Sequence, residues 1–349
     1  MDVMDYSLDI TDLATTIREK GWKRIGFQFP EGVKPHAGMI LSNLLDKLKV
    51  LQPDVVTEYY EFVQSGSSCY GACDLADHEL LMAGVDGMVH FGHSEIPNIT
   101  GNRFIPVIHQ EMRSKTELLP VVKQALEKDL LSDTVGLTTT VQHIHLLEGV
   151  RSFLESKGIE VRIGTGTDRL AYPGQVLGCS FSSATAVPEA DMHLFIGEGE
   201  FHAIGVSMAT RKKVIACDPC TGEIRDMDVE KDRILRQRFA AIQKLKDSND
   251  IAVILSTLPG QKRQMLAASL LKKGSDHGKN MVLITAPHLN LQSLVNLGAR
   301  VIVSTACPRV AIDDYEMYLE HAITITTPIE FLISIGEMEW DEYVLDTIE

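Results

Sequence analysis

Apolar positions recur in three long segments of the chain, and each segment predicts the same order of helix, strand, loop and helix. In each segment a run at helical spacing precedes a strand of consecutive apolar residues, and a loop of Gly, Thr or Pro follows. The three strands are expected to begin at Arg24, Thr134 and Ile251, roughly 110 to 117 residues apart. Behind each strand an amphipathic helix is expected, over residues 37–48, 144–157 and 264–273.

A further strand is expected later in each segment, in the stretches that begin at Val85, Ala190 and Gly298. Runs of Val, Ile, Leu and Phe without alternation are typical of parallel sheets that are covered on both faces. We therefore predict three tandem small α/β domains with mostly parallel sheets, related by internal repeat around a central site. The predicted domains comprise residues 1–114, 115–228 and 229–349.

Three of the six cysteines lie in loops of small residues, with one in each predicted domain: Cys73, Cys179 and Cys307. Cys73 follows the largely apolar segment 55–63 and precedes a helical run, and free N–H groups at the start of a helix favour a thiolate. Neighbouring glycines allow the backbone to approach a bulky ligand closely. We interpret the three cysteines together as one set of metal ligands, whereas any one of them alone would sooner be a small buried apolar side chain.

The other three cysteines give weaker patterns. Cys69 and Cys73 have the first interval of a radical S-adenosylmethionine motif, but Ala76 stands where the third cysteine belongs. Cys217 and Cys220 form a CxxC pair without a second pair or two histidines at ligand spacing, which favours a structural turn. The alternative is a zinc or redox enzyme that uses this pair together with Cys69 and Cys73.

Composition and charge exclude several classes of function. The chain has 349 residues and a formal net charge of −15, which argues against broad binding of nucleic acid because phosphate contacts require clustered Lys and Arg. No secretory signal pattern and no apolar run of about 18 residues occurs, so we expect a cytoplasmic protein without a membrane span. Six cysteines are too few for a disulfide scaffold.

Polar residues at the predicted carboxyl ends of strands are candidates for ligand binding, because α/β sheets bind ligands at that edge. Arg309 can hold a carboxylate with its planar guanidinium. For each residue, a cap, a turn or a solvated side chain is the alternative. The candidates for cofactor binding are His93, Gln142, Glu198, His202, Gln261 and Arg309.

Several motifs are similar to those of the diphthamide-synthesis family. They are FPEGV, CYGACD, FGHS, LGCSF, GEGEFH and CPRVAIDD, and together they extend over nearly the whole chain. The separations of the three cysteines, 106 residues from Cys73 to Cys179 and 128 from Cys179 to Cys307, resemble those of the family as well.

The resemblance implies that Cys73, Cys179 and Cys307 are the ligands of a [4Fe–4S] cluster with one iron free of protein ligands. It implies cleavage of the Cγ–S bond of S-adenosylmethionine (SAM) and transfer of the 3-amino-3-carboxypropyl group to C2 of a histidine in translation elongation factor 2. A homodimer and an electron donor are implied too. The alternative within the family is a non-catalytic subunit that holds a cluster for a partner.

Overall fold

The computed structural model describes residues 2–3, 5–51 and 60–349, and these divide into two compact units. One unit comprises Met1–Glu117 and Thr140–Leu146, and the other comprises Leu118–Thr139 and Leu147–Glu349. None of the described helices combines the length and the apolar character needed to cross a membrane.

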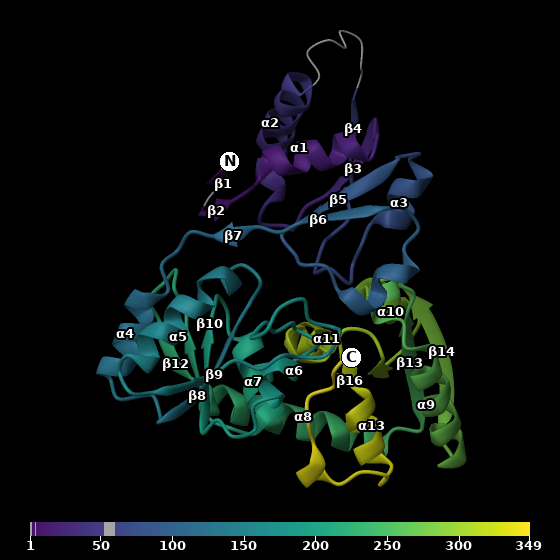
Figure 1. Cartoon of the computed structure of the whole chain (residues 1–349). Helices are drawn as coiled ribbons and strands as arrows, with labels where there is room; N and C mark the ends of the chain where they lie inside the picture. The colour runs from purple at the N-terminus through teal and green to yellow at the C-terminus, as the bar shows by residue number, and fades with distance from the viewer. Residues whose placement is uncertain (1, 4, 52–59) are drawn as a thin grey trace. The chain divides into compact units, whose positions relative to one another are not determined.

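The first unit contains a parallel sheet of four strands in the order β4-β3-β5-β6. Its strands are β3 (Arg24–Gln28), β4 (Glu61–Gln64), β5 (Gly87–Phe91) and β6 (Val107–Gln110). Helices α1 (Ile10–Glu19) and α2 (Ala37–Val50) lie beside each other and share one apolar core with β3 and β5 (Figure 1). Residues 55–59 of the apolar segment expected before Cys73 lie outside the described residues.

Helix α3 (Asp77–Met82) contributes to a second, smaller cluster with Val85, Met88 and Ile105. A Cβ atom at Gly26 would lie only 2.8 Å from Cδ1 of Leu80, so glycine in β3 allows this helix to approach the sheet. The rest of the unit consists of the 3-10 turns Lys34–His36, Pro97–Asn102 and Ile144–Leu146 and an antiparallel sheet of β1 (Asp2–Val3), β2 (Tyr6–Ser7) and β7 (Arg113–Ser114).

The second unit contains two sheets. The first has the order β12-β11-β10-β8-β9, in which only β12 is antiparallel to its neighbour. Its strands are β8 (Thr134–Thr139), β9 (Glu160–Arg162), β10 (Met192–Ile196), β11 (Val214–Cys217) and β12 (Ile224–Asp226). The accompanying helices are α4 (Leu119–Glu127), α5 (Leu147–Glu155), α6 (Ser182–Thr185) and α7 (Phe201–Thr210).

The second sheet of this unit is parallel throughout and has the order β14-β13-β15-β16. Its strands are β13 (Asp250–Ser256), β14 (Asn280–Ala286), β15 (Val301–Ser304) and β16 (Thr324–Thr326). Its helices are α8 (Asp228–Asp247), α9 (Gln264–Asp276), α10 (Leu291–Asn296), α11 (Arg309–Ile312), α12 (Tyr315–Glu320) and α13 (Pro328–Ser334), with 3-10 turns at Pro259–Gln261 and Trp340–Glu342.

A buried ion pair connects three helices of this unit. Arg238 of α8 binds both carboxylate oxygens of Glu330 in α13 at 2.7 Å, and its guanidinium also donates to the Ala311 carbonyl of α11. Both side chains are almost fully buried. The Thr327 side chain accepts from the Glu330 N–H, which begins α13 with a capping box. This network holds α11, the helix that follows Cys307.

The predicted α/β class with mostly parallel sheets is confirmed. The three sheets of four or five strands share one core order, in which the first strand in the chain lies between the second and the third, and the fourth lies outside the third. Strands β3 and β8 begin at the predicted residues, and β13 begins one residue early. The division into three domains with boundaries at 114 and 228 stays a prediction, since the compact units number two.

Candidate metal centre

Cys73 lies in the loop between β4 and α3 of the first unit and is half-buried. Gln28, at the end of β3, holds this loop from the buried side. Its Nε2 donates to the Asp74 carbonyl at 2.8 Å, and its Oε1 accepts from the Ala76 N–H at 3.1 Å. The loop geometry is therefore set by a side chain of the neighbouring strand. Cys73 stands before α3, which begins at Asp77, and not in its first turn.

Cys179 lies in the second unit, between β9 and α6, and is buried. The guanidinium of Arg169 approaches it, with Nη2 at 3.6 Å from Sγ and at 2.7 Å from the Gly260 carbonyl. Arg169 is only 2% exposed, its Nε makes no hydrogen bond, and within the described part of the chain no carboxylate pairs with it. A buried cation without a counter-ion is costly, so this environment suits a negatively charged group bound beside Cys179.

Cys307 follows β15 in the second unit, and its N–H donates to Oε1 of Gln261 at 3.1 Å. Gln261 and Gly260 belong to the same 3-10 turn, and the Gly260 carbonyl accepts from the Arg169 side chain beside Cys179. Gly178 also packs against Arg309, since a Cβ there would lie 2.7 Å from Cδ of that arginine. The structure thus brings the Cys179 and Cys307 loops together around one turn.

The C-terminal segment lies against the same loops, which sequence reasoning missed. The Ile348 N–H donates to the Cys179 carbonyl at 2.8 Å, and Ser180 Oγ donates to the Glu349 carboxylate at 3.2 Å. Arg263 pairs with Asp346 at 2.5 Å and donates to the Thr305 carbonyl at 2.8 Å. Burial raises the pKa of the Asp346 carboxyl despite this arginine. No local pattern in the segment signals these contacts, which arise from tertiary packing.

Arg309 and Gln261 each have a partner within the second unit. Arg309 pairs with Asp313, the C-cap residue of α11, at 2.5 Å and lies over the Phe201 ring, 4.6 Å from its centroid. Its guanidinium is exposed enough to exchange that carboxylate for one on a ligand. The Oε1 atom of Gln261 accepts from the Cys307 N–H, so this residue positions the cysteine loop.

The remaining candidates divide between the two units. In the first, Gln142 donates to the Gly92 carbonyl at 3.0 Å, one residue before His93. In the second, Glu198 accepts from the Cys220 thiol at 3.3 Å. Burial lowers the pKa of His202 to about 4, and the positive charge of Arg309 acts in the same direction. His202 is therefore neutral at physiological pH.

Cys217 and Cys220 carry no sign of a metal site in the described residues. Cys217 is buried in β11, where burial raises the pKa of its thiol to about 12. Neither cysteine forms a disulfide among the described residues, and no group of three potential ligands among the described side chains includes either one. The structural turn favoured by the sequence accounts for their positions.

Arg169 and Gln28 are the positioning residues that sequence reasoning missed. Arg169 directly follows the Gly- and Thr-rich stretch GTGTD, and its local sequence gives no further signal. Gln28 lies within the apolar run of β3, where a polar side chain has to find a buried partner. Neither pattern reveals which distant cysteine loop the side chain contacts.

The fold and these loops define a class of protein: a multi-sheet parallel α/β protein with cysteine-bearing loops at the carboxyl ends of its strands. A family model described as putative diphthamide synthesis protein matches residues 29–344. The chain belongs to the diphthamide synthesis family. The resemblance inferred from the motifs is confirmed.

Relatives match over most of their length. The 2-(3-amino-3-carboxypropyl)histidine synthase of Pyrococcus horikoshii is 35% identical, with 97% of this chain and 94% of the relative covered. The protein of the same name from Methanocaldococcus jannaschii is 28% identical over 88% and 83% of the two chains. Subunit 1 of the synthase from Gallus gallus is 24% identical over 98% and 80%.

A solved structure gives the same result for the fold. Dph2 from Pyrococcus horikoshii with a 4Fe-4S cluster superposes with a TM-score of 0.86 at 34% sequence identity. The match covers 98% of this chain and 94% of that one.

Proposed function

We propose that this chain is a [4Fe–4S] enzyme that transfers the 3-amino-3-carboxypropyl group of SAM to C2 of a histidine in translation elongation factor 2. The observation that carries the proposal is the match to the Pyrococcus horikoshii synthase and to the cluster-bearing Dph2 structure over nearly the whole of both chains. This reaction is the first step of diphthamide synthesis, and it makes the protein a transferase.

Cys73, Cys179 and Cys307 are the proposed ligands. The environment of Cys179 fits a negatively charged group, because the buried Arg169 beside it has no carboxylate partner among the described residues. Among the described residues none of the three cysteines forms a disulfide, and none lies within a helix or strand. When bound, a cluster held by three thiolates supplies an electron and one iron without a protein ligand, where a sulfonium can be reduced.

The chain's own residues position the reacting groups. Gln28 fixes the Cys73 loop, Gln261 fixes the Cys307 backbone, and Arg169 balances the charge of the Cys179 thiolate. Arg309 exchanges the Asp313 carboxylate for the carboxylate of SAM. The new ion pair orients the aminocarboxypropyl end of the substrate. Gln142, His93, Glu198 and His202 remain candidates for further SAM contacts.

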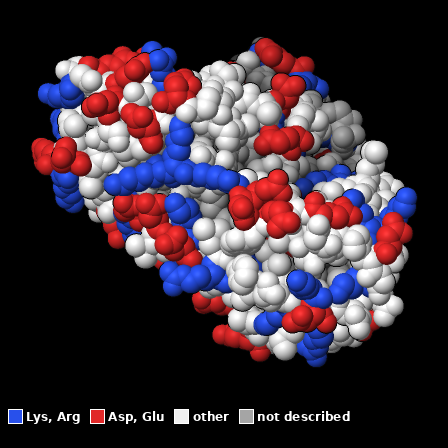
Figure 2. Space-filling view, turned by 90° about the horizontal axis from the view of Figure 1, so that it is seen from below, with Lys and Arg blue, Asp and Glu red and all other residues white. Residues whose placement is uncertain are grey.

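Because the proposed protein substrate is a translation factor, we propose that the reaction takes place in the cytoplasm. Reduction of the cluster requires an electron donor. On the face in Figure 2, acidic side chains flank the basic ones, and the described residues form no broad basic surface there of the kind that binds nucleic acid. The net charge of −15 is compatible with the approach of a positively charged substrate protein.

We also infer a homodimer that uses the edge strand β14. Val282 and Leu283 on this strand are 55% and 41% exposed, and Leu297 nearby is 60% exposed. An uncovered apolar edge strand is a site for pairing with another chain. A second copy of the chain is the proposed occupant.

The test combines the full-length chain, purified without oxygen, with dithionite, SAM and elongation factor 2. The expected result is release of methylthioadenosine and the mass increment of one aminocarboxypropyl group on the factor. Replacing Cys73, Cys179 or Cys307 by Ala should lower the rate by about 100-fold or more and deplete iron and sulfide. Cys220→Ala is the matched control and should retain both.

Two outcomes separate the alternatives. An iron–sulfur protein that forms neither product under these conditions would be a non-catalytic cluster-holding subunit. Zinc without iron and sulfide would instead indicate the zinc or redox enzyme.

A further inference from the structure

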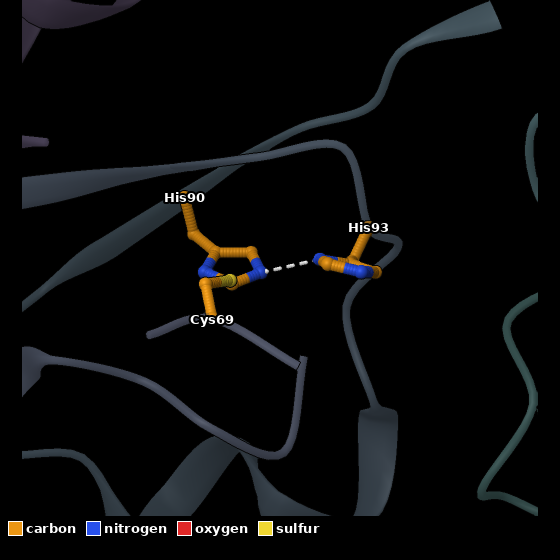
Figure 3. A group of neighbouring side chains, drawn as sticks. All are labelled: Cys69, His90 and His93. Carbon is orange, nitrogen blue, oxygen red and sulfur yellow. Dashed lines mark hydrogen bonds between the residues drawn. The ribbon is translucent and has the colours of Figure 1, made fainter. Parts of the chain in front are cut away.

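A second group of potential metal ligands lies in the first unit, separate from Cys73. Cys69 comes from the loop before Cys73, His90 is in β5, and His93 follows that strand (Figure 3). One ligand-type atom from each side chain lies within 4.8 Å of the other two. Cys69 is 5% exposed and His90 is fully buried, so the group is built into the interior of the unit.

Hydrogen bonds determine which nitrogen of His90 is available. The Nδ1 atom lies 2.9 Å from Oε1 of Gln28, which already accepts from the Ala76 N–H and is therefore the amide oxygen. His90 Nδ1 must be the protonated nitrogen, and Nε2 carries a lone pair. A metal-binding histidine typically donates its second N–H to an oxygen in this way.

The lone pair of His90 points at the second histidine. Its Nε2 lies 2.9 Å from Nδ1 of His93, so one proton bridges the two imidazoles. Burial lowers the pKa of His93 to about 4 and that of His90 far below its usual value. Both rings are neutral at physiological pH, which is the form that binds a metal.

His109 supplies a further unpaired nitrogen beside this group. It lies opposite His90 in the parallel pairing of β5 with β6, and the two ring centroids are 5.5 Å apart. Its Nε2 is buried without a hydrogen-bond partner among the described residues. A buried polar atom without a partner is costly, and a metal ion close to His90 would provide one.

We propose that Cys69, His90 and His93 bind one divalent ion of the zinc class, with His109 or water as the fourth ligand. Tetrahedral bonds of about 2.0 to 2.3 Å place ligand atoms roughly 3.3 to 3.5 Å apart, so modest side-chain shifts from the present separations complete the site. Binding releases the Cys69 thiol proton to solvent and transfers the proton between the imidazoles to the other nitrogen of His93.

The ion would anchor the loop that carries Cys73. Burial and the nearby Asp74 carboxylate raise the pKa of the Cys69 thiol to about 12, so without an ion the thiol is protonated. With the ion bound, the Cys69 thiolate ties that loop to β5. Cys69 stands four residues before Cys73 in the sequence. The site is structural, and its existence does not depend on the transferase reaction.

The experiment uses the full-length chain stripped of zinc and titrated with Zn²⁺ or Co²⁺. For wild type we expect about one ion per chain and a thiolate-to-cobalt charge-transfer band. Cys69→Ser and His93→Gln should each weaken binding by about 100-fold, and Cys69→Ser should abolish the band. Cys220→Ser, which removes an exposed thiol outside the site, is the matched control and should bind as wild type does.

Thermal unfolding with and without Zn²⁺ keeps the result interpretable. The metal should raise the unfolding temperature of wild type and of Cys220→Ser but not of Cys69→Ser or His93→Gln, while all four unfold at similar temperatures without metal. Metal binding that is unchanged in Cys69→Ser and His93→Gln would overturn the proposal. So would the absence of stoichiometric binding by wild type, which would leave the histidines as a hydrogen-bonded pair only.

Discussion

Arg169 is the residue whose surroundings bear most directly on the candidate centre. Its guanidinium is buried and forms no ion pair with a carboxylate among the described residues. The Nη2 atom lies 3.6 Å from the Cys179 sulfur. A fixed positive charge beside a redox group favours the state with one more electron.

Replacing Arg169 by Met should therefore lower the reduction potential of the bound cluster. We expect a shift on the order of 60 mV, which corresponds to a tenfold change in a one-electron equilibrium. Redox titration followed by electron paramagnetic resonance measures the shift, and Arg169→Lys should restore part of it. Arg300→Gln, at an exposed position, is the control. Equal potentials in Arg169→Met and wild type would contradict the role assigned to this charge.

His193 gives a prediction about pH. It is buried in β10, both ring nitrogens lack hydrogen-bond partners, and burial, with Lys212 second, lowers its pKa to about 4. In the unfolded chain the pKa of this histidine is about 6.5, so the unfolded chain takes up a proton there as the pH falls below 6.5, and the folded chain does not until about pH 4. The free energy of unfolding therefore falls as the pH is lowered from about 6.5 toward 4. At pH 5 the loss relative to pH 7 is about 2 kcal/mol from this residue.

Urea unfolding at pH 7 and pH 5 measures this difference. The fall in the free energy of unfolding should be smaller by about 2 kcal/mol in His193→Gln than in wild type. The exposed His321→Gln is the control and should behave as wild type does. An identical pH dependence in His193→Gln and wild type would mean that His193 does not titrate as described.

At the scale of elements, strand ends position the cysteine loops through glutamine side chains. Gln28 at the end of β3 holds the Cys73 loop, and Gln261 in the turn after β13 holds the Cys307 backbone. Because β3 and β13 are each the first strand of a sheet with the same order, the two glutamines act from corresponding parts of the fold.

Gln28→Ala should leave the Asp74 carbonyl and the Ala76 N–H without their buried partner. We expect a loss of about 1–3 kcal/mol in the free energy of unfolding and a lower content of iron and sulfide after reconstitution. Gln64→Ala, at the exposed end of the neighbouring strand β4, is the matched control. If Gln28→Ala retains the stability and iron content of wild type, Gln28 does not position the loop.

At the scale of the whole molecule, the edge strand β14 exposes apolar side chains. Exposed and half-buried residues follow one another along β14 without strict alternation. Val282 and Leu283 are exposed although β13 pairs with one edge of the strand. The proposed homodimer uses this edge because pairing with a second copy would cover it.

Val282→Lys should convert the dimer into a monomer, since a charge at a buried apolar contact is costly. Sedimentation at several protein concentrations measures the change. Val229→Lys, which alters an exposed valine at the start of α8, is the control and should leave the dimer intact. A dimer that persists in Val282→Lys would move the interface elsewhere.

The sequence by itself determined the class of the fold, the two central strands β3 and β5, β8 and β10, and β13 and β15 of the three main sheets, and the family. The strands that begin at Arg24 and Thr134 could be predicted because consecutive apolar residues are required wherever helices cover both faces of a sheet. Strand β14 was not predicted although Met281–Ile284 are consecutive apolar residues, and only the structure shows that it is a half-exposed edge strand. The loops of small residues around the three cysteines could also be predicted, because a glycine-rich loop is a local feature of the sequence.

Only the tertiary structure decided which distant residues meet. It brought Arg169, Gly260 and Gln261 to the Cys179 and Cys307 loops, and it placed Cys69 beside His90 and His93. The spacing of apolar residues in the sequence indicates whether a side chain is buried, but it does not indicate which other side chain it contacts. These contacts join side chains that are far apart in the sequence or on different elements, so they depend on how sheets and loops pack and on no local pattern of residues.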